Sequence, residues 1–259
     1  MMQKSLILVC DDAGFASTDR GIRILASESG LPMSAEYMIE QDGAPERARE
    51  MGKFALVERG LHFELSGISD AERVRMAKAL QARGTCLGEL EDIREKAIDD
   101  ARRQLELFRM TQDVDPTHVS THGNFNTEPD GKVAPWWYDL MDELFGGDIP
   151  PMQIDIPHVR HNLYSWNLPG TARMPRSETE FAEELRKVKD KTVVEFVMHP
   201  ALARQGDADI NMLFDVKMRR RDFWSALHIL RSGVIQEAGF KIVPVTALTR
   251  SRTTVLLTS

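Results

Sequence analysis

Short apolar runs alternate along the chain with longer stretches in which apolar residues recur every three or four positions. This alternation is the pattern expected for strands and helices that follow one another around a mostly parallel sheet. The apolar runs predict about seven strands, at residues 5–10, 34–39, 55–65, 118–121, 153–156, 192–198 and 241–245. The amphipathic stretches predict helices at residues 19–29, 44–51, 70–82, 88–110, 135–145, 178–189 and 222–238.

The length of the chain fits one α/β barrel-sized domain or two smaller ones. With 259 residues, of which 42% are hydrophobic, the chain can bury a substantial core. No internal repeat or low-complexity tract divides it, and the glycines and prolines at 146–151 indicate a loop inside a domain. We therefore expect a single domain spanning residues 1–259. Residues 158–176 lack periodicity and predict a long functional loop.

Charge and cysteine content exclude several classes of protein. The net charge is −7, which argues against nucleic-acid or anionic-membrane binding because such proteins need a basic surface. One basic cluster, at residues 217–221, is interpreted as a solvated helix entrance rather than a polyanion site. Cys10 and Cys86 allow neither a disulfide framework nor a CxxC motif. Neither a membrane-spanning run nor a signal-peptide pattern is present, so we expect a soluble, cytoplasmic protein.

Polar residues of metal-binding type recur where the apolar runs end. Asp11 and Asp12 close the first run, His62 and Glu64 lie in GLHFELSG, and His199 follows VVEFVM. Two histidines, 118 and 122, bracket the fourth run. Adjacent carboxylates repel each other unless a cation or proton lies between them. Because the carboxyl ends of parallel strands converge on one face, these residues can meet there.

Two imidazoles and a carboxylate form a plausible ligand set for Zn²⁺. If Asp12 binds a metal with His62 and His122, Asp11 is free to accept a proton from the nucleophilic water. His199 could then protonate the departing group.

Each of these residues also has a structural interpretation. The acidic pair before Gly14 is typical of a turn, His62 could be a core histidine, and His199 could belong to a strand-ending turn. For His118 the structural interpretation is favoured. The joint placement at several strand ends favours a functional site.

At these residues the sequence resembles the YdjC-like family of carbohydrate deacetylases, including chitooligosaccharide deacetylases, which is related to the polysaccharide deacetylases. VCDDAGFAS resembles the family's NADDFGLS, GLHFEL resembles GLHLNL, THVSTHGNFN resembles THLDSHHHVH, and EFVMHPA resembles ELMCHPG. The stretch from MRRRDFWSAL to the last predicted strand also resembles the family's ending. The resemblance therefore covers nearly the whole chain.

The resemblance implies a deformed TIM-barrel-like α/β fold and one divalent metal ion, Mg²⁺ or Zn²⁺. Carried over by position, Asp12, His62 and His122 are the metal ligands, Asp11 is the base, and His199 is the acid or a substrate contact. The implied reaction is hydrolysis of an N-acetyl group on an amino sugar.

The chain departs from the family motifs beside the predicted ligands. Ser120 stands where the family has Asp, two family histidines are replaced by Gly123 and Asn124, and Glu64 replaces Asn. These changes predict an altered substrate with the metal triad retained. Glu64 could reach a substrate amino or hydroxyl group, or orient His62. The candidate substrate-binding residues are Glu64, Asn124, Tyr164, Trp166 and Arg173.

The sequence thus predicts a metal-dependent deacetylase acting on a small acetylated carbohydrate, with no nucleic-acid partner, no membrane insertion and a possible homodimer. Two alternatives stay open. One is a non-catalytic carbohydrate-binding or regulatory protein with the same fold, which would not need the base Asp11. The other is a metal-dependent amide or ester hydrolase whose substrate is not a sugar.

Overall fold

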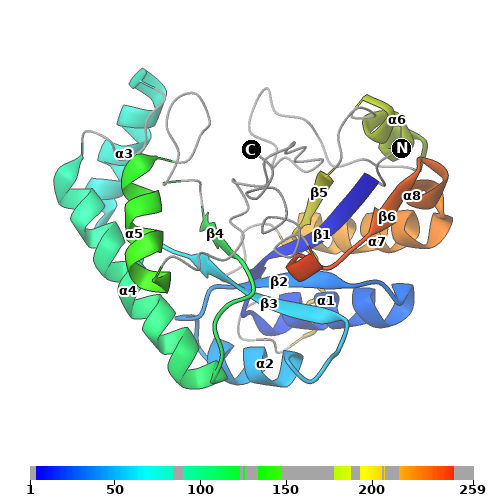
Figure 1. Cartoon of the computed structure of the whole chain (residues 1–259), viewed down its shortest axis with the longest axis horizontal. Coiled ribbons are helices and arrows are strands. Elements are labelled where there is room, and N and C mark those ends of the chain that lie inside the picture. The colour runs from blue at the N-terminus through cyan, green and yellow to red at the C-terminus, as the bar shows by residue number, and fades with distance from the viewer. Residues whose placement is uncertain are drawn as a thin grey trace, which may run out of the picture.

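A curled parallel sheet lies at the centre of the molecule, and helices line its outside (Figure 1). The computed structural model describes residues 4–83, 90–122, 125, 134–146, 178–187, 193–205, 207 and 216–247. Within these residues the strands are β1 (Lys4–Ala13), β2 (Met33–Tyr37), β3 (Val57–Phe63), β4 (Val119–Thr121), β5 (Val193–Met198) and β6 (Phe240–Ile242). All six coincide with predicted apolar runs. The run predicted at 153–156 lies outside the described residues.

The strand order is β4-β3-β2-β1-β5, with β6 paired to the amino-terminal end of β1. Each of these pairings is parallel. The sheet forms a half-barrel, which confirms the predicted deformed TIM-barrel-like α/β fold. Parallel pairing brings the carboxyl ends of the strands to one end of this half-barrel. The predicted site residues could meet only in such an arrangement.

The helices follow the predicted amphipathic stretches closely. They are α1 (Ala16–Ser29), α2 (Ala44–Met51), α3 (Asp70–Arg83), α4 (Glu91–Gln112), α5 (Pro135–Phe145), α6 (Glu178–Lys187), α7 (Val216–Ser232) and α8 (Val234–Glu237). Ser69 and Glu72 form a capping box at the start of α3, since each side chain bonds the other residue's backbone N–H. The last predicted helix differs: it begins at Val216 instead of residue 222, and it is interrupted at Gly233, whose φ is 81°.

The two faces of the sheet carry different side chains because successive residues of a strand point to opposite faces. Leu6, Leu8 and Cys10 of β1 belong to the main apolar core beneath the helices, as does Phe196 of β5. The thiol of Cys10 is free and buried. Among the described residues, no helix combines the length and apolar character needed to cross a membrane.

The alternate residues point into the half-barrel, and many of them are polar. We call this surface the inner face. It includes Asp11, Ser34, Glu36, Glu58, Gly60, His62, His118, Ser120, Glu195 and His199, of which seven are acids or histidines. Most of these polar side chains are buried. The strands therefore present an apolar side to the helices and a more polar side to the interior.

Candidate active site

An irregularity at the end of β1 places two adjacent carboxylates on the same side of the sheet. The pairing of β1 with β2 shifts register between Cys10 and Ala13, and Asp12 has a φ of 54°, in the left-handed region. A regular strand would send Asp11 and Asp12 to opposite faces. Instead, the Nε2 atom of His199 lies 3.8 Å from an Oδ2 atom of each. Because of the bulge, the carboxylates of Asp11 and Asp12, which are neighbours in the sequence, both lie near His199.

Gly14 permits the turn that follows this bulge. Its φ is 106°, and a Cβ atom there would lie 3.0 Å from the backbone oxygen of Met38. A larger residue would meet both a strained backbone and a close contact. The predicted turn is real, and it coexists with the site instead of replacing it.

Asp12 uses its two oxygens differently. Oδ2 accepts a hydrogen bond of 2.6 Å from the buried guanidinium of Arg219. Oδ1 is buried without a hydrogen-bond partner and faces Nε2 of His62 at 3.4 Å. Burial alone would raise the pKa of Asp12, but His62, His199 and Arg219 hold it well below its usual value. Asp12 is therefore an ionised carboxylate with one oxygen left for another partner.

Two of the three predicted metal ligands have donor atoms at a separation that suits a shared cation. Two donors on one tetrahedral zinc, with bonds of about 2.0–2.1 Å, are about 3.3 Å apart. The distance between Asp12 Oδ1 and His62 Nε2, 3.4 Å, has this size. The ring of His122 lies 5.5 Å from the ring of His62, between centroids, and it is exposed to solvent. His62 therefore lies beside both Asp12 and His122, but among the described residues these three do not form a group whose donor atoms all lie within 4.8 Å of one another.

A second combination of donors shares His62. Ligand atoms of Asp11, Glu36 and His62 lie within 4.8 Å of one another, and all three residues are buried. Hydrogen bonding to His62 and the charges of His118 and His62 outweigh burial and lower the pKa of Glu36 to about 2. Glu36 was not predicted as a site residue. The signal was a single acid inside the apolar strand SAEYMI, where burial would need a compensating partner.

Asp11 and His199 have shifted proton affinities. Burial, reinforced by the negative charge of Glu36, raises the pKa of Asp11 well above its usual value. Burial lowers the pKa of His199 to about 3, so its imidazole is neutral at pH 7. In this state Asp11 accepts a proton readily, whereas His199 must first receive one before it can act as an acid.

Arg219 corrects the interpretation of the basic cluster at 217–221. Arg220 and Arg221 are exposed, as expected of a solvated helix entrance. Arg219 is buried and bonds Asp12, so for this residue the interpretation is wrong. The reason is that α7 begins before the cluster and turns one of its arginines toward the strand ends.

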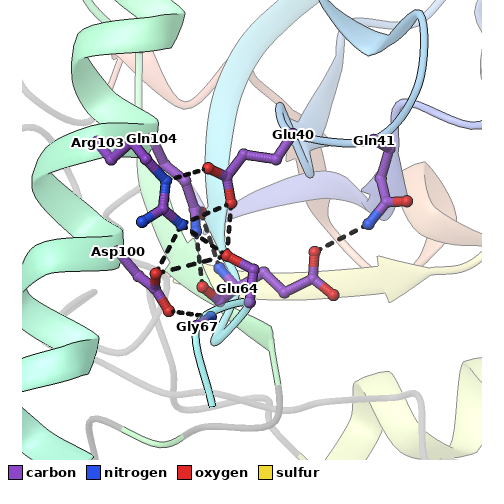
Figure 2. A network of polar contacts seen from close by, with 8 residues as sticks. Glu40, Gln41, Glu64, Gly67, Asp100, Arg103 and Gln104 are labelled. Carbon is purple, nitrogen blue, oxygen red and sulfur yellow. Dashed lines mark hydrogen bonds and ion pairs between the residues drawn. The ribbon is translucent and has the colours of Figure 1, made fainter. Parts of the chain in front are cut away.

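Glu64 follows β3 and is held in place by α4 (Figure 2). The side-chain amide of Gln104 bonds both the backbone N–H and the backbone carbonyl of Glu64, at 2.9 and 2.7 Å. Its carboxylate accepts a hydrogen bond of 2.9 Å from Gln41. Burial raises the pKa of Glu64, with a further contribution from nearby Asp12. A fixed carboxylate therefore lies near the site, although sequence reasoning did not identify Gln41 or Gln104.

The histidine at 118 has the structural role favoured for it. It is buried, its Nδ1 atom lies 2.8 Å from the hydroxyl of Thr117, and its Nε2 atom lies 3.4 Å from Glu36. Both of these contacts are made with side chains. The remaining predicted substrate contacts, Asn124, Tyr164, Trp166 and Arg173, lie outside the described residues.

Comparison with known proteins agrees with the fold and the motifs. The sequence model of the YdjC-like protein family matches residues 5–228. The search of curated proteins found no match. A solved structure from Enterococcus faecalis V583, named as a candidate cellobiose-phosphate cleavage protein, is similar with a TM-score of 0.60 and 16% identity, covering 95% of this chain and 99% of its own.

Two deacetylases share the fold at lower similarity. Peptidoglycan deacetylase PdaC from Bacillus subtilis has a TM-score of 0.51 and 14% identity, with 98% of this chain and 96% of that chain covered. The catalytic domain of a peptidoglycan N-acetylglucosamine deacetylase from Eubacterium rectale ATCC 33656 has a TM-score of 0.53 and 11% identity, with 93% and 88% covered. At these identities the likeness concerns the fold.

Proposed function

The chain belongs to the YdjC-like family, and we propose that it is a metal-dependent hydrolase that removes an N-acetyl group from an amino sugar. The observation that carries this proposal is the convergence of Asp11, Asp12, His62 and His199 at the strand ends, with both carboxylates 3.8 Å from one imidazole nitrogen. Such a cluster supplies ligands and proton-transfer groups side by side.

In this proposal Asp12, His62 and His122 hold the divalent ion, Zn²⁺ or Mg²⁺. The chemistry of the donors and the unpartnered Oδ1 atom of Asp12 support the assignment. A bound ion would polarise the acetyl carbonyl and lower the pKa of water. Arg219 fixes the other oxygen of Asp12, which keeps Oδ1 turned toward His62.

Asp11 is assigned as the general base. Hydrolysis adds hydroxide to the acyl carbon and a proton to the departing nitrogen, so one group must take a proton from water and one must return it. The raised pKa of Asp11 makes it a stronger base than a solvated carboxylate, which suits it to take that proton. Its Oδ2 atom lies 3.8 Å from Nε2 of His199.

His199 is assigned as a substrate contact beside Asp11. Its neutral imidazole cannot act as an acid, because burial lowers its pKa to about 3. Asp11, whose pKa burial raises, therefore keeps the proton that it takes from water and returns it to the departing amine, while the N–H of His199 is left to donate a hydrogen bond to the substrate. The order of proton movement is thus water to Asp11, then amine.

Glu64 is assigned to substrate binding. Its backbone is held by Gln104 and its carboxylate by Gln41, so it can accept hydrogen bonds from sugar hydroxyls without first being ordered (Figure 2). Asn124, Tyr164, Trp166 and Arg173 are further proposed contacts from the sequence. A cytoplasmic location and a homodimer stay predictions.

The test is an acetate-release screen over N-acetylated mono- and oligosaccharides, with Zn²⁺ or Mg²⁺ added to metal-stripped protein. We expect metal-dependent acetate release from at least one amino sugar, and loss of both activity and bound ion in His122→Ala. Ion binding without acetate release from any sugar would favour the carbohydrate-binding alternative. Absence of ion binding, measured by calorimetry and thermal stability, would contradict the metal site itself.

A further inference from the structure

Glu36 lies beneath His62 and takes no part in the proton transfers assigned above. It belongs to β2, is fully buried, and its carboxylate lies between two histidines of the inner face. Oε2 is 3.3 Å from Nδ1 of His62, and Oε1 is 3.4 Å from Nε2 of His118. A buried carboxylate in such a position is costly unless its partners compensate it.

The register of the strands explains how Glu36 reaches these histidines. Glu36 pairs with Gly60 across β2 and β3, and His62 pairs with Ser120 across β3 and β4. Gly60 has no side chain to occupy the space between its neighbours. A Cβ atom there would lie 2.3 Å from Nε2 of His118. The side chains of Glu36 and His118 therefore meet over the glycine, which brings the carboxylate within reach of the next row.

A relay of hydrogen bonds connects Glu36 to His62 through Ser120. The hydroxyl of Ser120 donates to Oε2 of Glu36 in a short hydrogen bond. That donation leaves the Ser120 oxygen as an acceptor for Nδ1 of His62, which lies 2.5 Å away. With the proton on Nδ1, the lone pair of His62 is on Nε2, the atom that faces Asp12.

We propose that Glu36 is the positioning residue that fixes the orientation and tautomer of His62 for ion binding. It supplies from β2 the carboxylate that the family motif THLDSH carries at the position of Ser120. A carboxylate behind a ligating histidine raises the basicity of the ligand and restrains its ring. The inference rests on the proposed function for the identity of the ion site. It adds that, in this chain, the carboxylate behind His62 comes from β2 instead of β4.

The test compares four full-length proteins: the wild type, Glu36→Gln, Glu36→Ser, and Glu36→Ser combined with Ser120→Asp. Zn²⁺ affinity is measured by calorimetry on metal-stripped protein. We expect Glu36→Gln and Glu36→Ser to weaken Zn²⁺ binding by about 10- to 100-fold. The double variant should recover to within about threefold of the wild type, because it returns a carboxylate to the neighbourhood of His62 from β4.

Glu58→Gln is the matched control on the same face. Its carboxylate bonds the backbone N–H groups of Val245 and Thr246 and has a structural role. Glu58→Gln should lower thermal stability and leave the Zn²⁺ affinity within about threefold of the wild-type value. Wild-type affinity in Glu36→Gln, or a double variant no better than Glu36→Ser, would overturn the inference.

A spectroscopic measurement separates this inference from the proposed function. Hydrogen bonding to Asp12 and Glu36 outweighs burial and raises the pKa of His62 well above its usual value, so the metal-free ring is neutral only above that raised pKa. The ¹⁵N chemical shifts of the ring, recorded as the pH is raised through this range, report its tautomer without metal or substrate. We expect the proton on Nδ1 in the wild type and a mixture of tautomers in Glu36→Gln. Ser120→Ala provides the same test if Glu36→Gln does not fold, because it removes the relay atom. An unchanged tautomer would refute the role of Glu36, whereas absence of acetate release alone would refute only the deacetylase proposal.

Discussion

The outer and inner faces of the same sheet perform different tasks. On the outer face, side chains such as Leu8 and Phe196 are fully buried against helices and stabilise the fold through apolar contact. On the inner face, Glu36, His62 and Asp12 are equally inaccessible but charged or polar. Burying such groups costs free energy unless each finds a partner. The comparison indicates that the outer face contributes most of the stability of the fold. The inner face holds the polar side chains from which the candidate site is built.

The largest expected effect comes from the outer face. Phe196 packs against Phe181 of α6 with ring centroids 4.8 Å apart. Phe196→Ala should lower the free energy of unfolding in urea by about 3–5 kcal/mol, because it removes buried apolar surface and leaves a cavity. At urea concentrations below the unfolding transition, the Zn²⁺ affinity of this variant should stay within about threefold of the wild-type value. A large loss of affinity would show that the two faces are not separable.

A smaller stability change, dependent on metal, is expected at Arg219. Arg219→Met leaves the buried carboxylate of Asp12 without its guanidinium partner, which should cost about 3 kcal/mol in metal-free protein. Added Zn²⁺ should reduce this difference, because the ion then compensates the charge of Asp12. The exposed neighbour Arg220 provides the control, and Arg220→Met should change neither quantity. An equal loss of stability with and without Zn²⁺ would argue that Arg219 only packs.

Gly60→Ala tests the crowding of the inner face. The added methyl group would lie 2.3 Å from the His118 ring, and this overpacking should cost about 1–3 kcal/mol of unfolding free energy. It should also weaken Zn²⁺ binding, because Glu36 is displaced. Gly52→Ala is the control, since its methyl group meets only the flexible guanidinium of Arg59. Unchanged stability and affinity in Gly60→Ala would contradict the geometry.

The smallest effect concerns Asp19, a buried acid in the first turn of α1 that pairs with Arg47 of α2. Burial raises its pKa from 3.8 to about 6, so between these values the folded protein binds more protons than the unfolded chain. Its contribution to the free energy of unfolding should therefore fall as pH rises from about 4 to about 7, by on the order of 2 kcal/mol. Urea titrations across this range should show a flatter profile for Asp19→Asn. If Asp19→Asn and the wild type showed the same dependence of stability on pH, a group other than Asp19 would be responsible for it.

The sequence predicts much of the fold because periodicity and strand-end chemistry are local signals. The predicted bounds of α2 and α5 agree with the structure, as does the series of parallel strands. Asp11, Asp12, His62 and His199 were found because each lies at or near the end of an apolar run, and the structure brings them together.

The rest of the site depends on contacts between distant residues. Glu36 reaches His62 only because Gly60 leaves space, and the bulge at Asp12 is a feature of strand pairing. Arg219 depends on where α7 begins and on how it is turned against β1. None of these can be read from a motif, since each is decided by tertiary packing.

The central claim is that the bulge at the end of β1 gives Asp11 and Asp12 different roles. The most direct measurement compares bound Zn²⁺ and acetate release in Asp11→Asn and Asp12→Asn, prepared in parallel with the wild type. The account predicts that Asp12→Asn loses both. It predicts that Asp11→Asn keeps its ion but loses acetate release by about 10²- to 10⁴-fold, the usual contribution of a general base. Wild-type activity in Asp11→Asn, or equal loss of the ion in both variants, would contradict it.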